Sequence, residues 1–475
     1  MLRVFNAMTH QKEEFKTIKP GIVSMYVCGP TVYNYIHLGN ARSAIAFDTI
    51  RRYLEYIGYQ VNYVSNFTDI DDKIIKAAKA AKVSEQVLTA KFEQAFDEDT
   101  APLNIKKATV RPLATEHVTE IIDFVKTLIN KGYAYESMGD VYFRARKFPE
   151  YGHLAHQSVD DLEIGASERL DDGALSKKED PIDFAVWKGV ANDASISWQS
   201  PWGAGRPGWH IECSVMAIKY LGDTIDIHGG GQDLAFPHHT NEIAQSEVYT
   251  GKTFANYWLH NGFVTVGDQQ EKMSKSLGNF VTVHDLLKDV NPQVLRLMMA
   301  TTQYRRPISY TETAMQDAEN TLKHLTTAYR NLYFRLIDAK TESANTVIVE
   351  KIATFIKHFK IAMDDDFNVA NAMTVIAEMA TYLNVLASQT DRLIKENIEG
   401  LLSEYTKMLM VLGIDIEKES NFKQTSDEQV EAKINERASA KISKDYQLAD
   451  KIRMELQAQG IILEDTPQGT RWHKE

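Results

Sequence analysis

The chain has 475 residues, of which 44% are hydrophobic and 25% charged, enough for about three domains of ordinary size. Its formal net charge of −12 argues against a protein that coats nucleic acid without specificity, because such binding needs a cationic surface. With two cysteines, no run of 18 apolar residues and no charged-then-apolar leader, the sequence predicts a cytoplasmic protein that does not cross a membrane.

The first third of the chain alternates strand-like and helical patterns. Residues 21–28 (GIVSMYVC) form an apolar run typical of a buried strand, and residues 60–67 (QVNYVSNF) form a second one. A helix is predicted between them from the spacing of Ala44, Phe47, Ile50, Leu54 and Ile57, and another begins in 69–82, with acidic residues in its first turn. This alternation predicts a parallel sheet with helical crossovers.

Residues 101–200 interrupt the alternation. They contain a helical pattern over 118–129, an expected hairpin around Gly139-Asp140, and a polar stretch from Tyr151 to Pro181 that is too long for an ordinary connector. The alternation resumes with a strand at 223–231 (DTIDIHGGG), a helix at 236–249 and a single strand at 256–266. The simplest account is a sheet that is split by an insertion.

After residue 283 the strands are expected to stop and helical periodicity takes over. This periodicity is clear at 313–337, 368–387 and 398–413, and three such segments predict an α-helical bundle. A polar linker at 417–429 then precedes two helices and a hairpin whose turn centres on Pro467-Gln468-Gly469. The predicted fold class is α/β: a Rossmann-like doubly wound parallel sheet with an inserted connective domain, followed by the bundle and a small C-terminal α+β module.

Two motifs are candidates for handling phosphate. His37-Leu38-Gly39-Asn40 lies in the first βα connection, where doubly wound folds bind ligands and a helix N-terminus favours an anion; an ordinary helix cap explains it equally well. Lys272 and Lys275, in the loop EKMSKSLGN, form a cationic clamp that could close over a triphosphate, or a solvated surface loop. Gly251-Lys252-Thr253 is no P-loop, because Ser246 stands where the first glycine is needed.

A third set of residues has the chemistry of metal ligands. Cys28 and Cys213 are the two cysteines, and His238 and Glu242 lie four apart on a predicted helix and so face the same way. Thiolates with an imidazole and a carboxylate suit zinc better than calcium or magnesium. The alternatives are two small buried hydrophobes or a disulfide for the cysteines, and a surface His–Glu contact for the helix pair.

The glycine-rich strand end at 226–234 (DIHGGGQDL) leaves room for a planar group or a ribose. Asp233 or His228 could accept hydroxyl or ammonium hydrogens there. A tight turn explains the three glycines equally well.

These motifs together resemble one family, the cysteinyl-tRNA synthetases of the class I aminoacyl-tRNA synthetases. The matching strings, in the family's order, are CGPTVYNYIHLGN, WHIECS, HGGGQDLAFPHHTNE, KMSKS and DYQLADKIRMELQAQGIILEDTPQGTRW, which together span most of the chain. The chain departs from the family's usual first signature, His-Ile-Gly-His, by carrying Asn40 at the last position. The resemblance implies one zinc ion per chain, bound by Cys28, Cys213, His238 and Glu242, with the thiol of the substrate as a further ligand.

The resemblance also implies roles for other residues. The catalytic residues would be His37, Asn40, Lys272 and Lys275, with Mg²⁺ accompanying ATP. ATP would contact Thr31, His37, Gly39, Asn40, Gly230, Asp233 and Lys275. The substrate cysteine would contact Gly29, Thr31, Thr68, Trp209 and His228. The tRNA anticodon would contact Arg437, Asp445, Asp450, Arg453 and Trp472, although solvated helix faces explain these last residues equally well.

The expected activity is ATP-dependent attachment of L-cysteine to tRNA(Cys) through a cysteinyl-adenylate, by a monomer without an obligatory protein partner. The expected domains are the catalytic halves 1–110 and 206–283, the inserted domain 111–205, the bundle 284–416, the linker 417–429 and an anticodon-binding module 430–475. One alternative is a ligase that joins cysteine to a small amino-sugar acceptor, which the tail beyond Asn421 disfavours. Another is a zinc-containing RNA-binding protein without catalysis, which the Lys272–Ser276 loop disfavours.

Overall fold

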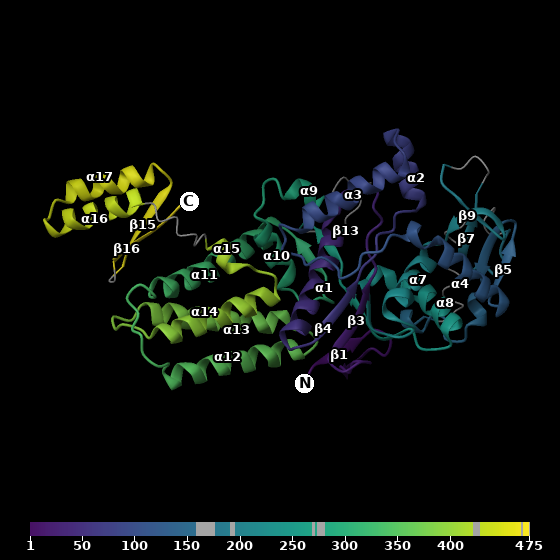
Figure 1. Cartoon of the computed structure of the whole chain (residues 1–475), viewed down its shortest axis with the longest axis horizontal. Helices are drawn as coiled ribbons and strands as arrows, with labels where there is room; N and C mark the ends of the chain where they lie inside the picture. Colours follow the sequence, from purple (N-terminus) through teal and green to yellow (C-terminus); the bar gives the residue numbers. More distant parts are fainter. Residues whose placement is uncertain are drawn as a thin grey trace. The chain divides into compact units, whose positions relative to one another are not determined.

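The computed structural model describes residues 1–157, 176–190, 195–267, 271–272, 281–420, 428–466 and 469–474 (Figure 1). The chain divides into two compact units, Met1–Gln316 with Met363–Val369, and Asp317–Ala362 with Ala370–Glu475. Four predictions lie partly or wholly outside the described residues: the lysine loop with Lys275, the middle of the 151–181 stretch, the middle of the linker, and the hairpin turn at 467–468.

A four-stranded parallel sheet lies at the centre of the first unit. Its strand order is β11 (Ala255–Asn261), β10 (Ile225–Gly231), β3 (Ile22–Val27) and β4 (Gln60–Val64). Every neighbouring pair is parallel, as the alternating sequence pattern predicts. The chain leaves β3 to form β4 on one side, whereas β10 lies on the other, so the strand order reverses between β3 and β10. Ligands of doubly wound sheets bind at such a point, beyond the carboxyl ends of the strands.

Helices cover both faces of this sheet. Figure 1 shows α1 (Leu38–Tyr56) on one side of β3 and β4, and α7 (Trp209–Leu221) with α8 (Thr240–Thr250) on the other. Phe47 of α1 packs directly on β10, where a Cβ at Gly229 would lie 2.3 Å from its ring. Met216 of α7 and Ile243 of α8 share a core with Tyr26 of the sheet. This burial holds α7, which carries Cys213, and α8, which carries Glu242 and begins just after His238, against the sheet.

The insertion forms its own antiparallel sheet, with the expected hairpin at its edge. The strand order is β5 (Ala134–Ser137), β6 (Asp140–Phe143), β7 (Phe184–Gly189), β9 (Gly203–Pro207) and β8 (Trp198–Ser200). Helix α4 (Val118–Asn130) buries Ile121, Val125 and Leu128 in one core with strand residues such as Phe143. Between β4 and this insertion lie α2 (Asp72–Ala81) and α3 (Glu85–Thr100), and a hairpin of β1 (Arg3–Asn6) and β2 (Gln11–Glu14) begins the chain.

Two details of the predicted strands are wrong. Residues 256–266 are not one strand, because β11 ends at Asn261 and β12 (Val264–Val266) belongs to a second sheet with β13 (Glu271–Lys272) and β14 (Ile308–Tyr310). The break falls at Gly262, where a Cβ would lie 2.4 Å from the carbonyl carbon of Arg306. Strand β14 also shows that strands do not stop after residue 283; it pairs in parallel with β12.

The second unit consists mostly of helices. Its first part contains α11 (Glu312–Phe334), α12 (Thr346–Asp364), α13 (Val369–Ala387), α14 (Lys395–Val411) and α15 (Ile416–Glu419), of which α12 is not among the helices predicted above. Among the described residues α13 alone is long and apolar enough to cross a membrane, and 44% of its most apolar window is buried. Its buried residues Val375, Met379 and Leu383 recur at helical spacing, as in the core helix of a globular domain.

The C-terminal module contains the expected two helices and hairpin. These are α16 (Glu428–Ile442), α17 (Tyr446–Gln457), β15 (Ile461–Thr466) and β16 (Gly469–Lys474). Ile434, Ile452 and Leu463 form a small core between the helices and the hairpin, and Trp472 packs against it.

Candidate active site and metal centre

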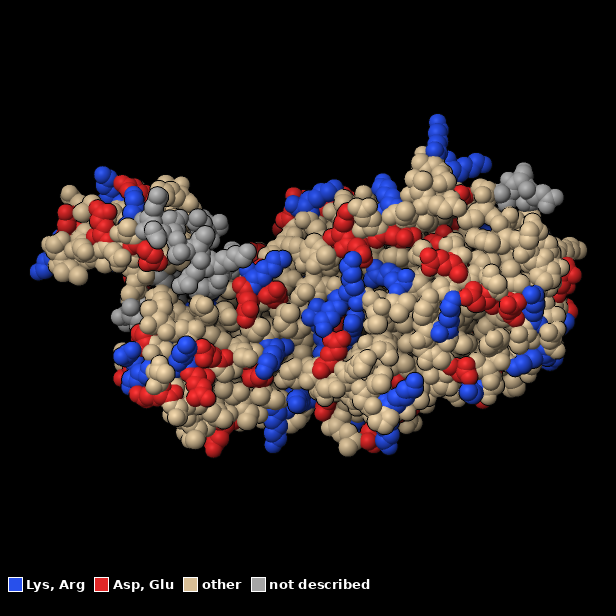
Figure 2. Space-filling view, viewed as in Figure 1, with Lys and Arg blue, Asp and Glu red and all other residues tan. Residues whose placement is uncertain are grey.

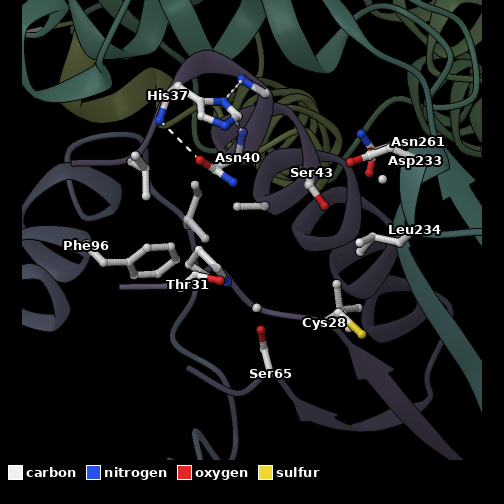
Figure 3. Close-up of a pocket in the computed structure, with 18 of the residues that line it drawn as sticks. Cys28, Thr31, His37, Asn40, Ser43, Ser65, Phe96, Asp233, Leu234 and Asn261 are labelled. Carbon is white, nitrogen blue, oxygen red and sulfur yellow. Dashed lines mark hydrogen bonds between the residues drawn. The ribbon is translucent and has the colours of Figure 1, made fainter. Parts of the chain in front are cut away.

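A cavity of about 410 Å³ lies beyond the carboxyl ends of β3 and β10 (Figure 3). Its walls come from the segment after β3, the first turn of α1, and the turn after β10. The predicted site residues that line it are Cys28, Gly29, Thr31, His37, Gly39, Asn40, Trp209 and Asp233. Residues separated by some 200 positions in the sequence therefore meet in one cavity.

The four candidate metal ligands converge at one wall of this cavity, and Cys28 is the one of the four that lines it. The ligand atoms of Cys28, Cys213, His238 and Glu242 all lie within 4.8 Å of one another. The Cys28 Sγ lies 3.6 Å from the Cys213 Sγ, and 3.4 Å from both His238 Nε2 and Glu242 Oε1. Both cysteines are free, so the alternative of a disulfide is not the state of this structure. Two sulfurs, one imidazole nitrogen and one carboxylate oxygen at these separations fit a zinc ion.

Tight backbone packing places Cys28 at the end of β3. Its N–H donates to the Gly229 carbonyl of β10, at 3.2 Å, and the N–H of Gly29 donates to Asn66 Oδ1, at 3.0 Å. A Cβ on Gly29 would lie 1.6 Å from the backbone oxygen of Asn66. Only glycine therefore fits directly after the first candidate ligand.

The protonation of the cluster is set by burial and by mutual contacts. Burial raises the pKa of Cys28 well above its usual value, while a hydrogen bond from Cys28 lowers the pKa of Cys213 to about 6. Burial opposes the ionisation of Glu242, but His228 and His238 hold the pKa of its carboxyl well below the usual range. The pair of thiols thus loses one proton readily and the second with difficulty, as expected of a site in which a cation would stabilise both thiolates.

Four further histidines lie behind the cluster, and of these the sequence singled out only His228, as a substrate contact. His238 turns Nε2 toward Cys28 because its Nδ1 lies 2.9 Å from Nδ1 of His210. His228 Nε2 lies 2.9 Å from Glu242 Oε2, and His239 Nδ1 lies 2.8 Å from His260 Nε2. Such contacts orient ligands from behind. His210, His239 and His260 stand in WHIECS, FPHHTNE and WLHNG, and the density of histidines in these strings is the sequence signal that could have found them.

The other residues predicted to bind the amino acid lie at different depths. The ring of Trp209 is 39% exposed and lies 4.4 Å, centroid to centroid, from that of His238. Thr68 is buried, its backbone N–H donates to Pro30, and its hydroxyl accepts a hydrogen bond from Asn66. Thr68, His228 and Gly230 do not line the cavity described above.

His37 and Asn40 form a reciprocal cap at the start of α1 (Figure 3). His37 Nδ1 accepts from the backbone N–H groups of Gly39, at 3.0 Å, and Asn40, at 3.3 Å, while Asn40 Oδ1 accepts from the His37 N–H, at 3.2 Å. Since Nδ1 is an acceptor, the neutral imidazole carries its proton on Nε2. His37 therefore presents a hydrogen-bond donor, and Asn40 supplies the acceptor that completes the cap.

Both ends of the lysine loop are tied to the cavity edge. Before the loop, Lys272 of β13 pairs with Thr265 of β12, and Val264 of β12 lines the cavity. After the loop, the Val283 N–H donates to the Ile36 carbonyl, at 2.9 Å. The loop thereby starts at the cavity wall and ends next to His37, where Thr282 forms a β-bridge with that residue.

The candidate tRNA residues in the C-terminal module differ in their availability. Arg437 is buried and makes two hydrogen bonds to Asp465, at 2.7 and 2.8 Å. Asp445 caps α17 through Leu448 N–H, and Trp472 Nε1 donates to Glu431. Two further side chains, Asp450 and Arg453, are exposed on α17.

The fold and site define a class I aminoacyl-tRNA synthetase. Residues 14–320 match the family model described as tRNA synthetases class I (C) catalytic domain, and residues 358–417 match a DALR domain. The fold is similar to that of Mycobacterium tuberculosis methionyl-tRNA synthetase, with a TM-score of 0.59 at 15% identity over 82% of this chain and 89% of that one. It is similar to Agrobacterium radiobacter LeuRS in a ternary complex, with a TM-score of 0.60 at 11% identity over 86% of each chain. The predicted fold class is confirmed.

Relatives that are more than half identical to this chain narrow the class to one family. The chain is 60% identical to the cysteine–tRNA ligase of Lactiplantibacillus plantarum over 475 residues, 100% of both chains. It is 57% identical to that of Ligilactobacillus salivarius over 474 residues, again 100% of both. The chain belongs to the cysteine–tRNA ligase family of enzymes.

Proposed function

We propose that the enzyme charges tRNA(Cys) in two steps within the 410 Å³ cavity. In the first, the carboxylate of L-cysteine attacks the α-phosphorus of ATP, which releases pyrophosphate and forms cysteinyl-adenylate. In the second, the terminal ribose hydroxyl of the tRNA attacks the mixed anhydride, loses its proton and displaces AMP. Holding the reactants in one cavity converts each encounter into a unimolecular step.

Cys28, Cys213, His238 and Glu242 would hold one zinc ion at the floor of this cavity. When bound, zinc supplies a soft Lewis acid that favours a thiolate ligand over the harder, less acidic hydroxyl of serine. A pocket that relied on size alone would separate such near-isosteres by only about 10- to 200-fold. Since Trp209 packs on His238, it would close over the substrate side chain, and Thr68 and Gly29 would help to orient the amino acid.

The chain's own donors would bind the triphosphate. His37 would donate from Nε2 to a phosphate oxygen, because its Nδ1 is occupied in the cap. The side chain of Asn40, in place of the family's second histidine, would act by holding the backbone of His37 in the cap. Lys272 and Lys275, with Mg²⁺, would neutralise the charge that develops on the phosphorus, and Thr31, Gly39, Gly230 and Asp233 would contact the nucleotide. His228 remains a predicted substrate contact, and its bond to Glu242 also suits it to orient that ligand.

The rest of the chain would bind tRNA. We keep the division proposed from the sequence, with catalytic halves 1–110 and 206–283, the insertion 111–205, the bundle 284–416, the linker 417–429 and an anticodon module 430–475. Arg453 is available for base or phosphate contacts and Asp450 for base contacts, whereas Arg437 would have to leave Asp465. The enzyme would act as a cytoplasmic monomer.

The convergence of the four ligand atoms within 4.8 Å of one another carries this proposal. The test is cysteine-dependent exchange of pyrophosphate into ATP by the zinc-loaded enzyme. Deletion of residues 422–475 should leave exchange intact and sharply reduce tRNA charging, because the anticodon module plays no part in adenylation. Absence of exchange in the intact enzyme would refute adenylation. Cys213→Ser should lose zinc and cysteine affinity together; a variant that keeps full zinc affinity would refute the ligand set.

A further inference from the structure

Helix α2 carries a row of lysines that the mechanism above does not use. Lys73, Lys76, Lys79 and Lys82 recur every three residues from its first turn to its C-cap; we call these four residues the lysine ridge. With Asp72 as the single acid, residues 72–82 carry a formal charge of +3 in a chain whose net charge is −12. A local reversal of sign this strong marks a surface suited to a polyanion.

The charge of the ridge is not neutralised by neighbours. Within the described residues Lys76, Lys79 and Lys82 form no ion pair, and all three are exposed. Asp72, the acid at the start of the helix, is itself bound by Lys188 and Arg206. Figure 2 shows blue side chains that project from the surface over α2 with little red around them. The three ammonium groups are therefore free to bind an external anion.

The helix below the ridge is firmly anchored. Ile74 and Ala78, four residues apart, are buried, and α2 packs against α3. The side chain of Asp71 caps the helix by accepting from the Lys73 N–H, at 2.8 Å. The lysines thus stand on a rigid support, so that little backbone order is lost when a ligand binds.

The ridge starts at the mouth of the active-site cavity. Lys73 lines that cavity together with Tyr33, and its Nζ lies 5.9 Å from the centre of the Tyr33 ring. From Lys73 to Lys82 the helix rises about 14 Å, at about 1.5 Å a residue. The four lysines therefore extend from the cavity edge to the far end of α2, each turned by about 60° around the helix axis from the one before, so that together they cross the exposed side of the helix.

We propose that the lysine ridge binds the phosphates of the tRNA next to its 3′ end. The proposal rests on the cysteine–tRNA ligase activity, in which the terminal ribose has to enter the cavity while the preceding nucleotides remain outside its mouth. Lysines bind phosphate as point charges and carry no sequence information, so the ridge positions the end of the tRNA and does not select it.

The test compares two triple variants of the full-length enzyme. The ridge variant is Lys76→Ala/Lys79→Ala/Lys82→Ala, which leaves Lys73 at the cavity and uses the best helix former. The control is Lys16→Ala/Lys19→Ala/Lys252→Ala, which removes the same charge before β3 and β11, at the amino ends of the strands; none of these three lysines lines the active-site cavity. Aminoacylation is measured as a function of tRNA and salt concentration, and pyrophosphate exchange without tRNA.

Each phosphate contact adds about 0.7 to 0.9 to the steepness of the plot of log affinity against log salt concentration. At 0.15 M salt this corresponds to about fivefold in affinity for each contact. The ridge variant should therefore raise the KM for tRNA by about 10- to 100-fold and lower the salt slope by about 2. The control should change both by less than about twofold. Replacing the three ridge lysines by arginine should keep the wild-type values, since the charge is preserved.

Two further measurements separate the outcomes. Pyrophosphate exchange should stay at the wild-type rate in the ridge variant. Loss of exchange in this variant would place the lysines in adenylation and overturn the proposal. Absence of exchange in the wild type would instead count against the proposed function itself. A short RNA with only the acceptor arm should lose affinity as the full tRNA does. An unchanged KM for tRNA, or a loss confined to the full tRNA, would overturn the assignment to the 3′ end.

Discussion

Replacing Gly29 by alanine alters no proposed zinc ligand, yet it should destroy the metal centre. The new Cβ would lie 1.6 Å from the backbone oxygen of Asn66, and real Cβ contacts do not fall below 3.0 Å, so the ends of β3 and β4 must separate by about 1.4 Å. Cys28 is the next residue and has to move with Gly29. Zinc–sulfur bonds lie close to 2.3 Å and tolerate only about 0.2 Å. The displacement exceeds this tolerance several-fold.

The expected loss in zinc affinity is at least about 100-fold, the upper end of what removal of a supporting contact costs. Overpacking and the weakened hydrogen bond from Gly29 to Asn66 should also lower the free energy of unfolding by about 2–4 kcal/mol. Zinc affinity is measured by competition with a chromophoric chelator, and stability by thermal unfolding. Cysteine-dependent exchange should fall with the zinc content.

Gly400→Ala is the matched control. Gly400 lies within α14, where a Cβ would meet only the side-chain tip of Ile352, at 3.3 Å, so this variant should be neutral or more stable by up to about 1 kcal/mol. If Gly29→Ala bound zinc as tightly as the wild type, the close approach of β3 and β4 would not position Cys28, and the reasoning would be refuted.

Other parts of the first unit give further predictions. Asp48→Asn should lower the free energy of unfolding by about 3–5 kcal/mol, measured by denaturant titration, because it removes the carboxylate that neutralises the buried Arg52 and Arg296. Burial opposes ionisation of Asp48, but these arginines lower its pKa in the folded state. The unfolded chain therefore binds the proton more readily, so the free energy of unfolding of the wild type should decrease as the pH drops below about 4. The decrease should be smaller in Asp48→Asn, which has no carboxyl group to protonate at this position. Asp366→Ala should destabilise the first unit by a similar amount, because the buried Asp366 carboxylate accepts hydrogen bonds from Arg305 and from the Phe5 N–H. Thermal unfolding measures the loss, and Asp365→Ala is the control because the carboxylate of Asp365 is exposed. Removal of zinc with a chelator should lower the unfolding temperature and abolish exchange, both restored by zinc; full activity after removal would contradict a role for zinc.

Local sequence patterns predicted most of the secondary structure because they depend on neighbouring residues. The apolar run at 21–28 and the spacing from Ala44 to Ile57 correspond to β3 and α1. The pattern at 256–266 failed because its break depends on contact between Gly262 and Arg306, 44 positions away. No local periodicity reports such a contact.

The sequence by itself determined the chemistry of the site: which side chains are thiols, imidazoles and carboxylates, and that their order resembles one family. Only the tertiary structure decided that Cys28, from the end of β3, meets Cys213, His238 and Glu242, because α7 and α8 pack their buried faces on the sheet next to that strand. It also decided that His210 and His228 stand behind the ligands, since burial and pairing arise only when separate segments pack together.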